Sequence, residues 1–241
     1  MPRYDWIIFD FTGTLMTPDP EPAEAYYSAA KASGSEHSLE QIRDQLKAAM
    51  KRHFFEADID QPTDEAGELR RWRRIVADAI PDLPDESADK VFDSLWHHFA
   101  TAETWRLYDD VPPTIGRLRS KGYAIAVASN FDRRLTMILG DMGLKDQFDE
   151  VLISSQLGWS KPSTRFYDAA VARLGAAQLR AKGSRAKGSG AAAWDATDRS
   201  RLLMIGDTKR GDVDAARQAG LDARLLVRGG ETALAELTAD L

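Results

Sequence analysis

Strand-like segments occur at both ends of this chain, and a long helical region separates the first of them from all the others. Residues 5–10 form a short apolar run that is typical of a buried strand. From about residue 105 onward, apolar runs alternate with helical patterns, which indicates a parallel sheet covered by helices on both faces. The first strand therefore belongs to the same sheet. We expect a Rossmann-like α/β core formed by residues 1–16 and 105–241.

The intervening residues 17–104 have the periodicity of helices. Apolar residues recur at helical spacing around residues 39–53, 69–79 and 91–99, and a shorter helix is expected near residues 23–33. Pro62, Pro81 and Pro84 lie between these stretches, where prolines end helices. We therefore predict a four-helix cap domain that is inserted into the core.

Composition narrows the class of protein. The chain has 241 residues, a formal net charge of −6 and no cysteine. An acidic chain is a poor match to general nucleic-acid binding, and the lack of cysteine excludes disulfides, thiolate nucleophiles and Cys-ligated zinc. No apolar run approaches the roughly 20 residues of a membrane helix, and the first residues lack the apolar core of a signal peptide. We expect a cytoplasmic protein with no membrane partner, and the pattern does not specify its oligomeric state.

Strands are expected at residues 123–128, 150–153, 202–205 and 223–227, with helices at 111–121, 134–142, 165–174 and 212–219. Residues 176–200 interrupt this rhythm. They are rich in Ala, Gly, Ser and Lys, a composition typical of linkers, and we predict a mobile excursion there.

Polar residues follow four of the predicted strands. Because the carboxyl ends of parallel strands meet at one edge of a sheet, we expect these residues to form a single site. They are Asp10, Thr12, Ser129, Asn130, Lys161, Asp207 and Asp212.

These residue types suit phosphoryl transfer, in which catalysis is mostly positioning and charge neutralisation. Asp10 can attack phosphorus and form an aspartyl-phosphate. Asp10, Asp207 and Asp212 supply the carboxylates that Mg²⁺ favours.

The remaining candidates would hold the phosphoryl group. The Ser129 hydroxyl, with Asn130 beside it, is the predicted binding group for phosphoryl oxygens, and Lys161 supplies a positive charge for the phosphate and the nucleophile.

The order of these motifs resembles that of the haloacid dehalogenase-like (HAD) superfamily over almost the whole chain, and the helical insertion is similar to its C1 caps. The most specific stretch is Asp10-Phe11-Thr12-Gly13-Thr14. The resemblance implies an Asp10 nucleophile, a magnesium ion and a further metal ligand in the backbone carbonyl of Thr12. It also implies that the Ser129 hydroxyl binds phosphate and that Lys161 is the stabilising cation. Asp207 and Asp212 would be acidic ligands of the magnesium ion.

Thr12 departs from the family pattern. HAD phosphatases usually have a second aspartate there, whose carboxyl protonates the leaving oxygen and then activates water. A threonine hydroxyl does not titrate near neutral pH, and general acid–base catalysis is typically worth about 10²–10⁴-fold. We expect a magnesium-dependent phosphohydrolase of a small phosphorylated metabolite, with slow turnover or a substrate that compensates for the missing acid.

Two alternatives stay open. One is a hydrolase of the dehalogenase or phosphonatase type. A dehalogenase has no need for magnesium. A phosphonatase uses a cap lysine, for which Lys47 and Lys51 are candidates here. The other is a catalytically impaired protein that keeps the phosphate and metal sites. Arg70, Arg71, Arg73 and Arg74 are expected on a solvated face of a cap helix, opposite a buried stripe that includes Leu69 and Trp72.

Overall fold

Five parallel strands form the centre of the molecule, in the order β5-β4-β1-β6-β7. The computed structural model describes residues 3–56, 58–184, 198–229 and 233–241. Every pairing in the sheet is parallel, which confirms the predicted α/β core. The strands are β1 (Trp6–Phe9), β4 (Ala124–Ser129), β5 (Glu150–Ile153), β6 (Leu202–Gly206) and β7 (Asp222–Leu225).

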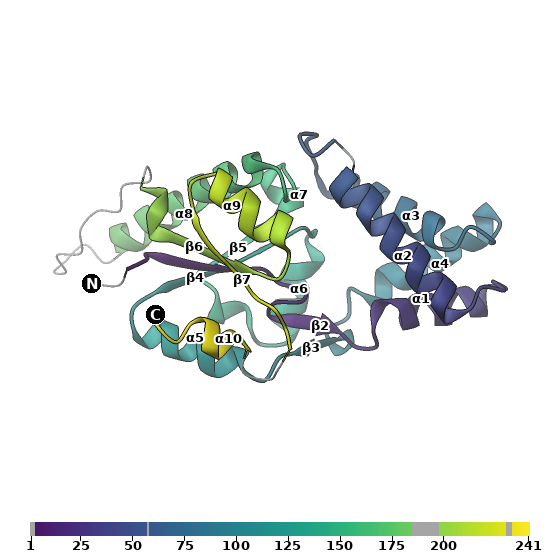
Figure 1. Cartoon of the computed structure of the whole chain (residues 1–241), viewed down its shortest axis with the longest axis horizontal. Helices are drawn as coiled ribbons and strands as arrows, with labels where there is room; N and C mark the ends of the chain where they lie inside the picture. The colour runs from purple at the N-terminus through teal and green to yellow at the C-terminus, as the bar shows by residue number, and fades with distance from the viewer. Residues whose placement is uncertain (1–2, 57, 185–197, 230–232) are drawn as a thin grey trace.

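Helices cover both faces of the sheet (Figure 1). Alternate side chains of a strand point to opposite faces, so Ile7 and Phe9 belong to one apolar cluster and Trp6 and Ile8 to the other. The first cluster packs against α5 (Val111–Ser120), α6 (Arg134–Asp141) and α10 (Ala233–Leu237). The second packs against α8 (Thr164–Ser184) and α9 (Ala215–Gln218). Both faces of the sheet are buried under helices, which explains why the strands are near-continuous apolar runs.

A helical cap lies beside the core, as predicted. It contains α1 (Pro22–Ala32), α2 (Leu39–Lys51), α3 (Glu65–Ala79) and α4 (Asp85–His98), which stand together on the right of Figure 1. Helix α2 begins at a capping box in which Ser38 and Gln41 exchange hydrogen bonds. The buried faces form an apolar cluster of their own around Ile42, Ile75 and Val91. The cap therefore has a separate hydrophobic core.

A two-stranded ribbon joins the cap to the core. Strands β2 (Met16–Pro18) and β3 (Trp105–Leu107) pair antiparallel at the two points where the chain passes between the cap and the core. Sequence patterns did not predict this ribbon, because each strand has only three residues and the partner is far along the chain. The ribbon holds the entry and exit of the cap side by side.

The excursion predicted for residues 176–200 is wrong at its start, because α8 continues to Ser184. Ala177 packs against the cluster under α8, and Gln178 accepts a hydrogen bond from the Trp6 ring nitrogen at 3.1 Å. Ala, Leu, Gln and Arg are also strong helix formers. Residues 185–197 of the predicted excursion lie outside the described residues.

Short helical turns complete the chain. They are η1 (Arg52–Glu56), η2 (Ala102–Thr104), η3 (Lys145–Gln147), α7 (Ser154–Leu157), η4 (Arg199–Arg201) and η5 (Lys209–Asp214). None of the helices in the described ranges is both long and apolar enough to cross a lipid bilayer.

Candidate active site

The predicted site residues meet at the carboxyl edge of the three central strands. Phe9, the last residue of β1, is level with Val127 of β4 and Ile205 of β6. The next residue along the chain is Asp10, and its N–H donates to the Ile205 carbonyl at 2.9 Å. Strand β1 is in the middle of the sheet, so Asp10 is flanked by protein on both sides and is only 7% exposed.

Lys161 binds two of the predicted carboxylates at once. Its Nζ donates to Asp10 Oδ1 at 2.7 Å, to Asp212 Oδ1 at 2.6 Å and to the Ala128 carbonyl at 3.1 Å. The sequence placed Lys161 at the start of a helix directly after the strand at 150–153. In the structure α7 intervenes, and Lys161 lies in the loop before α8. That loop returns to the sheet edge, so the lysine still reaches the site.

Burial dominates the electrostatics of this group. Burial raises the pKa of Asp10 to about 8 against the opposing attraction of Lys161, and the negative charges of Asp212 and Asp207 add to the rise. Burial alone would lower the pKa of Lys161, but its attraction to Asp10 and Asp212 outweighs burial and raises that pKa. The lysine is therefore charged at any physiological pH.

Two glycines make room for the carboxylates. Gly13 has φ of 80°, and a Cβ on it would lie 2.2 Å from Asp207 Oδ2. A Cβ on Gly206 would lie 2.3 Å from Asp212 Cγ. Any other residue at either position would displace an acidic group, so the Gly-Thr and Gly-Asp pairs in the sequence are part of the site.

Three carboxylates can hold a metal ion here. Asp10, Asp207 and Asp212 each offer an oxygen, and these oxygens lie within 4.8 Å of one another. Carboxylate oxygens are the donors that Mg²⁺ prefers, and one lysine cannot neutralise three of them. The donor set therefore fits a hard divalent cation. We call Asp10, Lys161, Asp207 and Asp212 the catalytic cluster, after the role proposed for them below.

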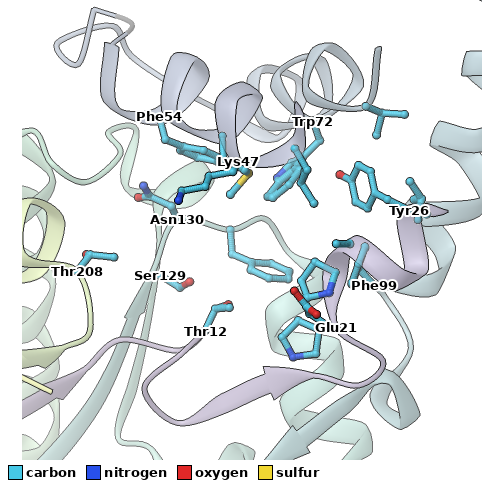
Figure 2. Close-up of a pocket in the computed structure, with 18 of the residues that line it drawn as sticks. Thr12, Glu21, Tyr26, Lys47, Phe54, Trp72, Phe99, Ser129, Asn130 and Thr208 are labelled. Carbon is cyan, nitrogen blue, oxygen red and sulfur yellow. The ribbon is translucent and has the colours of Figure 1, made fainter. Parts of the chain in front are cut away.

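The remaining predicted residues surround this cluster. Ser129 is buried at the end of β4, and Thr12 is exposed toward the cavity from the turn after β1 (Figure 2). The Asn130 side chain exchanges two hydrogen bonds of 2.7 Å with the backbone of Lys161. Asn130 thus positions the lysine as well as lining the cavity.

A cavity of about 580 Å³ extends from the catalytic cluster into the cap. Its floor is formed by core residues, including Asp10, Thr12 and Ser129. Its far wall comes from cap residues such as Tyr26 and Trp72, whose side chains point into the space in Figure 2. A site of this size is large enough for a drug-sized molecule.

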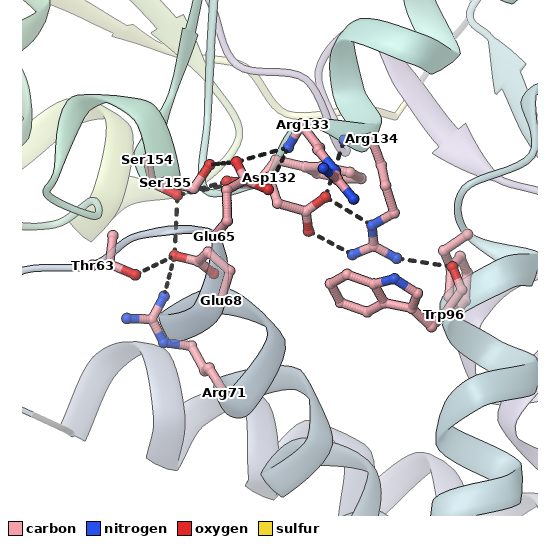
Figure 3. A network of polar contacts seen from close by, with 12 residues as sticks. Thr63, Glu65, Glu68, Arg71, Trp96, Asp132, Arg133, Arg134, Ser154 and Ser155 are labelled. Carbon is pink, nitrogen blue, oxygen red and sulfur yellow. Dashed lines mark hydrogen bonds and ion pairs between the residues drawn. The ribbon is translucent and has the colours of Figure 1, made fainter.

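Sequence reasoning missed a second group of charged side chains, at the contact between the cap and the core, of which Glu68, Asp132 and Arg134 are buried. Glu68 of α3 is fully buried, and its Oε1 accepts hydrogen bonds from Arg71 at 2.7 Å and Ser154 at 3.2 Å. Glu65 accepts from Ser155 and from the Arg133 backbone (Figure 3). Arg71 was expected on a solvated face, but it also reaches Ser160 at 3.2 Å. The expected buried stripe of α3 is likewise wrong at Leu69, which is 37% exposed.

Arg134 makes the other contact of this kind. Its guanidinium forms a two-pronged pair with Asp132, at 2.8 and 2.7 Å, and donates to the Trp96 carbonyl of the cap at 3.0 Å. It also lies over the Trp96 ring, 3.3 Å from the ring centroid (Figure 3). We call Glu65, Glu68, Arg71, Asp132 and Arg134 the junction cluster. Its two ion pairs are local in sequence, but the contacts that join the cap to the core, such as Ser154 with Glu68 and Arg134 with the Trp96 carbonyl, have no fixed spacing that a sequence pattern could reveal.

Comparisons with known proteins agree with this architecture. The family model described as haloacid dehalogenase-like hydrolase matches residues 4–220. The human protein named haloacid dehalogenase-like hydrolase domain-containing protein 3 is 31% identical over 171 residues, which cover 68% of this chain and 67% of that protein.

Solved structures share the fold. A putative HAD-hydrolase, YfnB, from Bacillus subtilis, bound to magnesium, has a TM-score of 0.65 at 17% identity and covers 93% of this chain and 89% of its own. A dehalogenase solved with an intermediate complex has a TM-score of 0.67 at 19% identity, over 100% of this chain and 98% of its own. With the matched family model, the parallel core and the helical insertion, the chain belongs to the haloacid dehalogenase-like hydrolase family.

Proposed function

We propose that this hydrolase is a Mg²⁺-dependent phosphohydrolase of a small phosphorylated metabolite, acting through an aspartyl-phosphate on Asp10. The observation that supports it most is the catalytic cluster itself. A buried nucleophile candidate, a lysine and two further carboxylates converge at the open end of one cavity. A phosphoryl group brought there meets an attacking carboxylate and the cations needed to hold it.

The proposed roles follow from position. Asp10 attacks phosphorus, because it lies at the cavity floor directly after β1, where Lys161 binds one of its oxygens. The Ser129 hydroxyl binds a phosphoryl oxygen, and Lys161 compensates negative charge on the phosphate and on Asp10. Asp10, Asp207, Asp212 and the Thr12 carbonyl would hold the magnesium ion, which supplies charge neutralisation for the transferring phosphoryl group.

Thr12 determines how the reaction ends. Its hydroxyl can donate a hydrogen bond to a leaving oxygen, but it cannot deliver a proton or activate water as a carboxylate does. We infer that the enzyme favours leaving groups that depart without a proton, and that hydrolysis of the aspartyl-phosphate is its slow step. The cap would exclude bulk water and select the substrate.

Asp207 is the observation that favours a phosphohydrolase over a dehalogenase. A displacement at carbon needs an attacking carboxylate and no metal, and it gains nothing from an additional acidic group beside the nucleophile. Here Asp207 raises the negative charge around Asp10, as its effect on the Asp10 pKa shows. Such crowding is unfavourable unless a cation or a phosphoryl-bound metal compensates it.

The test is to detect the covalent intermediate. Acetyl phosphate, whose leaving group needs no proton, would be mixed with the protein and Mg²⁺, quenched in acid and digested for peptide mass analysis. We expect phosphate on the peptide that contains Asp10, and we expect both this adduct and turnover to be lost in Asp10→Asn. Asp19→Asn, the same change at a side chain 64% exposed, should keep both. Turnover that survives in Asp10→Asn would overturn the assignment, and halide release from 2-haloacids without magnesium would favour a dehalogenase.

A further inference from the structure

The cavity is much larger than a phosphoryl group needs, and the part beyond the catalytic cluster is apolar. Its walls include Tyr26, Met50, Phe54, Trp72, Phe99 and Phe131. In Figure 2 the rings of Phe54, Trp72 and Tyr26 line the cap side, opposite Thr12 and Ser129 at the floor. The organic part of a substrate attached at Asp10 would extend into this aromatic chamber.

Most polar groups in the chamber are already bonded to other protein groups. Arg134 is held by Asp132 and the Trp96 carbonyl, as described above. Arg43 pairs with Glu21 at 3.0 Å. A polyhydroxylated substrate such as a sugar phosphate would have to lose water from many hydroxyls and would find few free partners in exchange, which is unfavourable. The chamber is therefore built for an apolar group.

Two polar groups in the chamber are left over. Among the residues that the structure describes, neither the Tyr26 hydroxyl nor the Lys47 ammonium has a hydrogen-bond or ion-pair partner. Tyr26 is only 2% exposed, and its hydroxyl points into the chamber in Figure 2. Two such groups can orient one ligand without making the chamber polar.

Thr12 restricts the leaving group from the opposite end. An aliphatic alkoxide must be protonated as it departs, and no titratable group stands at position 12 to do so. A phenol has a pKa of about 10, so a phenolate is a far better leaving group and can depart without a proton. A phenol therefore meets both requirements: it departs without a proton from an acid at position 12, and its ring packs against the aromatic walls of the chamber.

We propose that the preferred substrates of this site are phosphate monoesters of apolar phenols, with the ring and its apolar substituents held in the chamber between Phe54, Trp72 and Phe131. This inference rests on the proposed phosphohydrolase function. In the reaction, an Asp10 oxygen forms a bond to phosphorus as the bond from phosphorus to the phenolic oxygen breaks. The phenolate leaves with the electron pair of that bond and takes its proton from water.

The test is a series of 4-alkylphenyl phosphates from unsubstituted to butyl, assayed with Mg²⁺ on the full chain. Their leaving groups have nearly the same pKa, so differences in kcat/KM report contact with the chamber. We expect kcat/KM to rise roughly fourfold per methylene, the factor for full burial of a CH₂ group. The value of kcat/KM should be lower for 4-(hydroxymethyl)phenyl phosphate than for 4-ethylphenyl phosphate, although the two substituents are similar in size.

Acetyl phosphate, assayed in parallel, separates the two proposals. Turnover of acetyl phosphate that depends on Asp10, together with a flat or falling alkyl series, would overturn the substrate class and leave the phosphohydrolase intact. No turnover of acetyl phosphate and none of any aryl ester would overturn the proposed function, and this inference with it.

A matched pair of variants locates the effect in the chamber. Met50→Gln places an amide in the apolar wall, and Met137→Gln makes the same change on α6, where the side chain is 55% exposed. For each protein we take kcat/KM for 4-butylphenyl phosphate divided by kcat/KM for phenyl phosphate. We expect this ratio to be roughly tenfold lower in Met50→Gln than in the wild type. Met137→Gln should keep the wild-type ratio. Because each ratio is taken within one variant, a change in the folded fraction cancels, and equal ratios in the two variants would overturn the proposal.

Discussion

The catalytic cluster and the junction cluster both combine acidic and basic side chains and are both largely buried, but they differ in the balance of the two. In the junction cluster, each of the two buried acids has an arginine beside it, Arg134 at Asp132 and Arg71 at Glu68. In the catalytic cluster, one lysine faces three carboxylates. A closed set of pairs on each side of the contact supports the junction between cap and core, whereas a set with excess negative charge is ready to accept a cation. The difference in charge balance supports a structural role for the junction cluster and the proposed catalytic role for the other.

Lys161→Met would remove the only cation of the catalytic cluster and should have the largest effect. We expect kcat/KM for acetyl phosphate to fall roughly 10³–10⁵-fold, the range seen when a charge-stabilising cation is lost from phosphoryl transfer. Lys90→Met, the same change at a side chain 71% exposed on α4, should leave the rate unchanged. Steady-state assays at saturating Mg²⁺ would measure both. A loss of less than tenfold in Lys161→Met would mean that the lysine is a structural counter-charge like those of the junction cluster.

Thr12→Asp would add a titratable carboxyl to the same cluster. For an alkyl phosphate, whose leaving group needs a proton, we expect the rate to rise by about 10²–10⁴-fold. Thr12→Asn has a similar shape and no titratable proton, so it should give no gain. The gain should shrink with acetyl phosphate, which needs no acid. If Thr12→Asp and Thr12→Asn have the same rate with the alkyl ester, the missing carboxyl does not limit turnover.

Arg134→Met would break the closed cluster instead. Asp132 would then be left buried without its partner, and removing one member of a buried pair typically lowers stability by about 3–5 kcal/mol. The neighbouring Arg133 is exposed, so Arg133→Met should change the free energy of unfolding by about 0.5 kcal/mol or less. Urea unfolding of the two variants gives the comparison. Equal losses would show that the Asp132–Arg134 pair adds no stability beyond that of a surface residue.

The fold could be predicted from the sequence where side chains recur at the period of a strand or a helix, and the site could be predicted where parallel strands end at a common edge. Strand runs such as residues 5–10 and helical stripes such as that of Ile42 and Leu46 follow side-chain periodicity. The convergence of Asp10, Lys161 and Asp212 could be predicted because parallel strands end at one edge.

The rest depends on contacts between segments that no spacing relates. Glu68 lies on a helix whose apolar pattern favoured Leu69 for burial, and the approach of α7, which carries Ser154, buries Glu68 instead. The β2–β3 ribbon and the aromatic chamber have the same origin, since each forms between parts of the chain that are distant in sequence. Sequence thus predicts where chemistry can occur better than what the site will accept.

Glu68 offers the smallest and most specific test of the closed cluster. Burial raises the pKa of Glu68 above its ordinary 4.5, although Arg71, Thr63 and Ser154 oppose the shift, and its Oε2 has no hydrogen-bond partner within the described part of the chain. The folded protein therefore holds this proton more tightly than the unfolded chain does. The stability that the neutral carboxyl contributes is complete below about pH 4.5 and is lost as pH rises through the folded pKa.

Glu68→Gln cannot lose that stability, because an amide does not titrate. The free energy of unfolding of the wild type minus that of Glu68→Gln should fall as pH rises above 4.5, by at most about 1.4 kcal/mol per pH unit. Chemical unfolding of the two proteins at a series of pH values would measure it. A difference that grows with pH for Glu68→Gln would mean that the ionised carboxylate is the form stabilised by Arg71. The junction would then depend on charge attraction rather than on a buried, hydrogen-bonded acid.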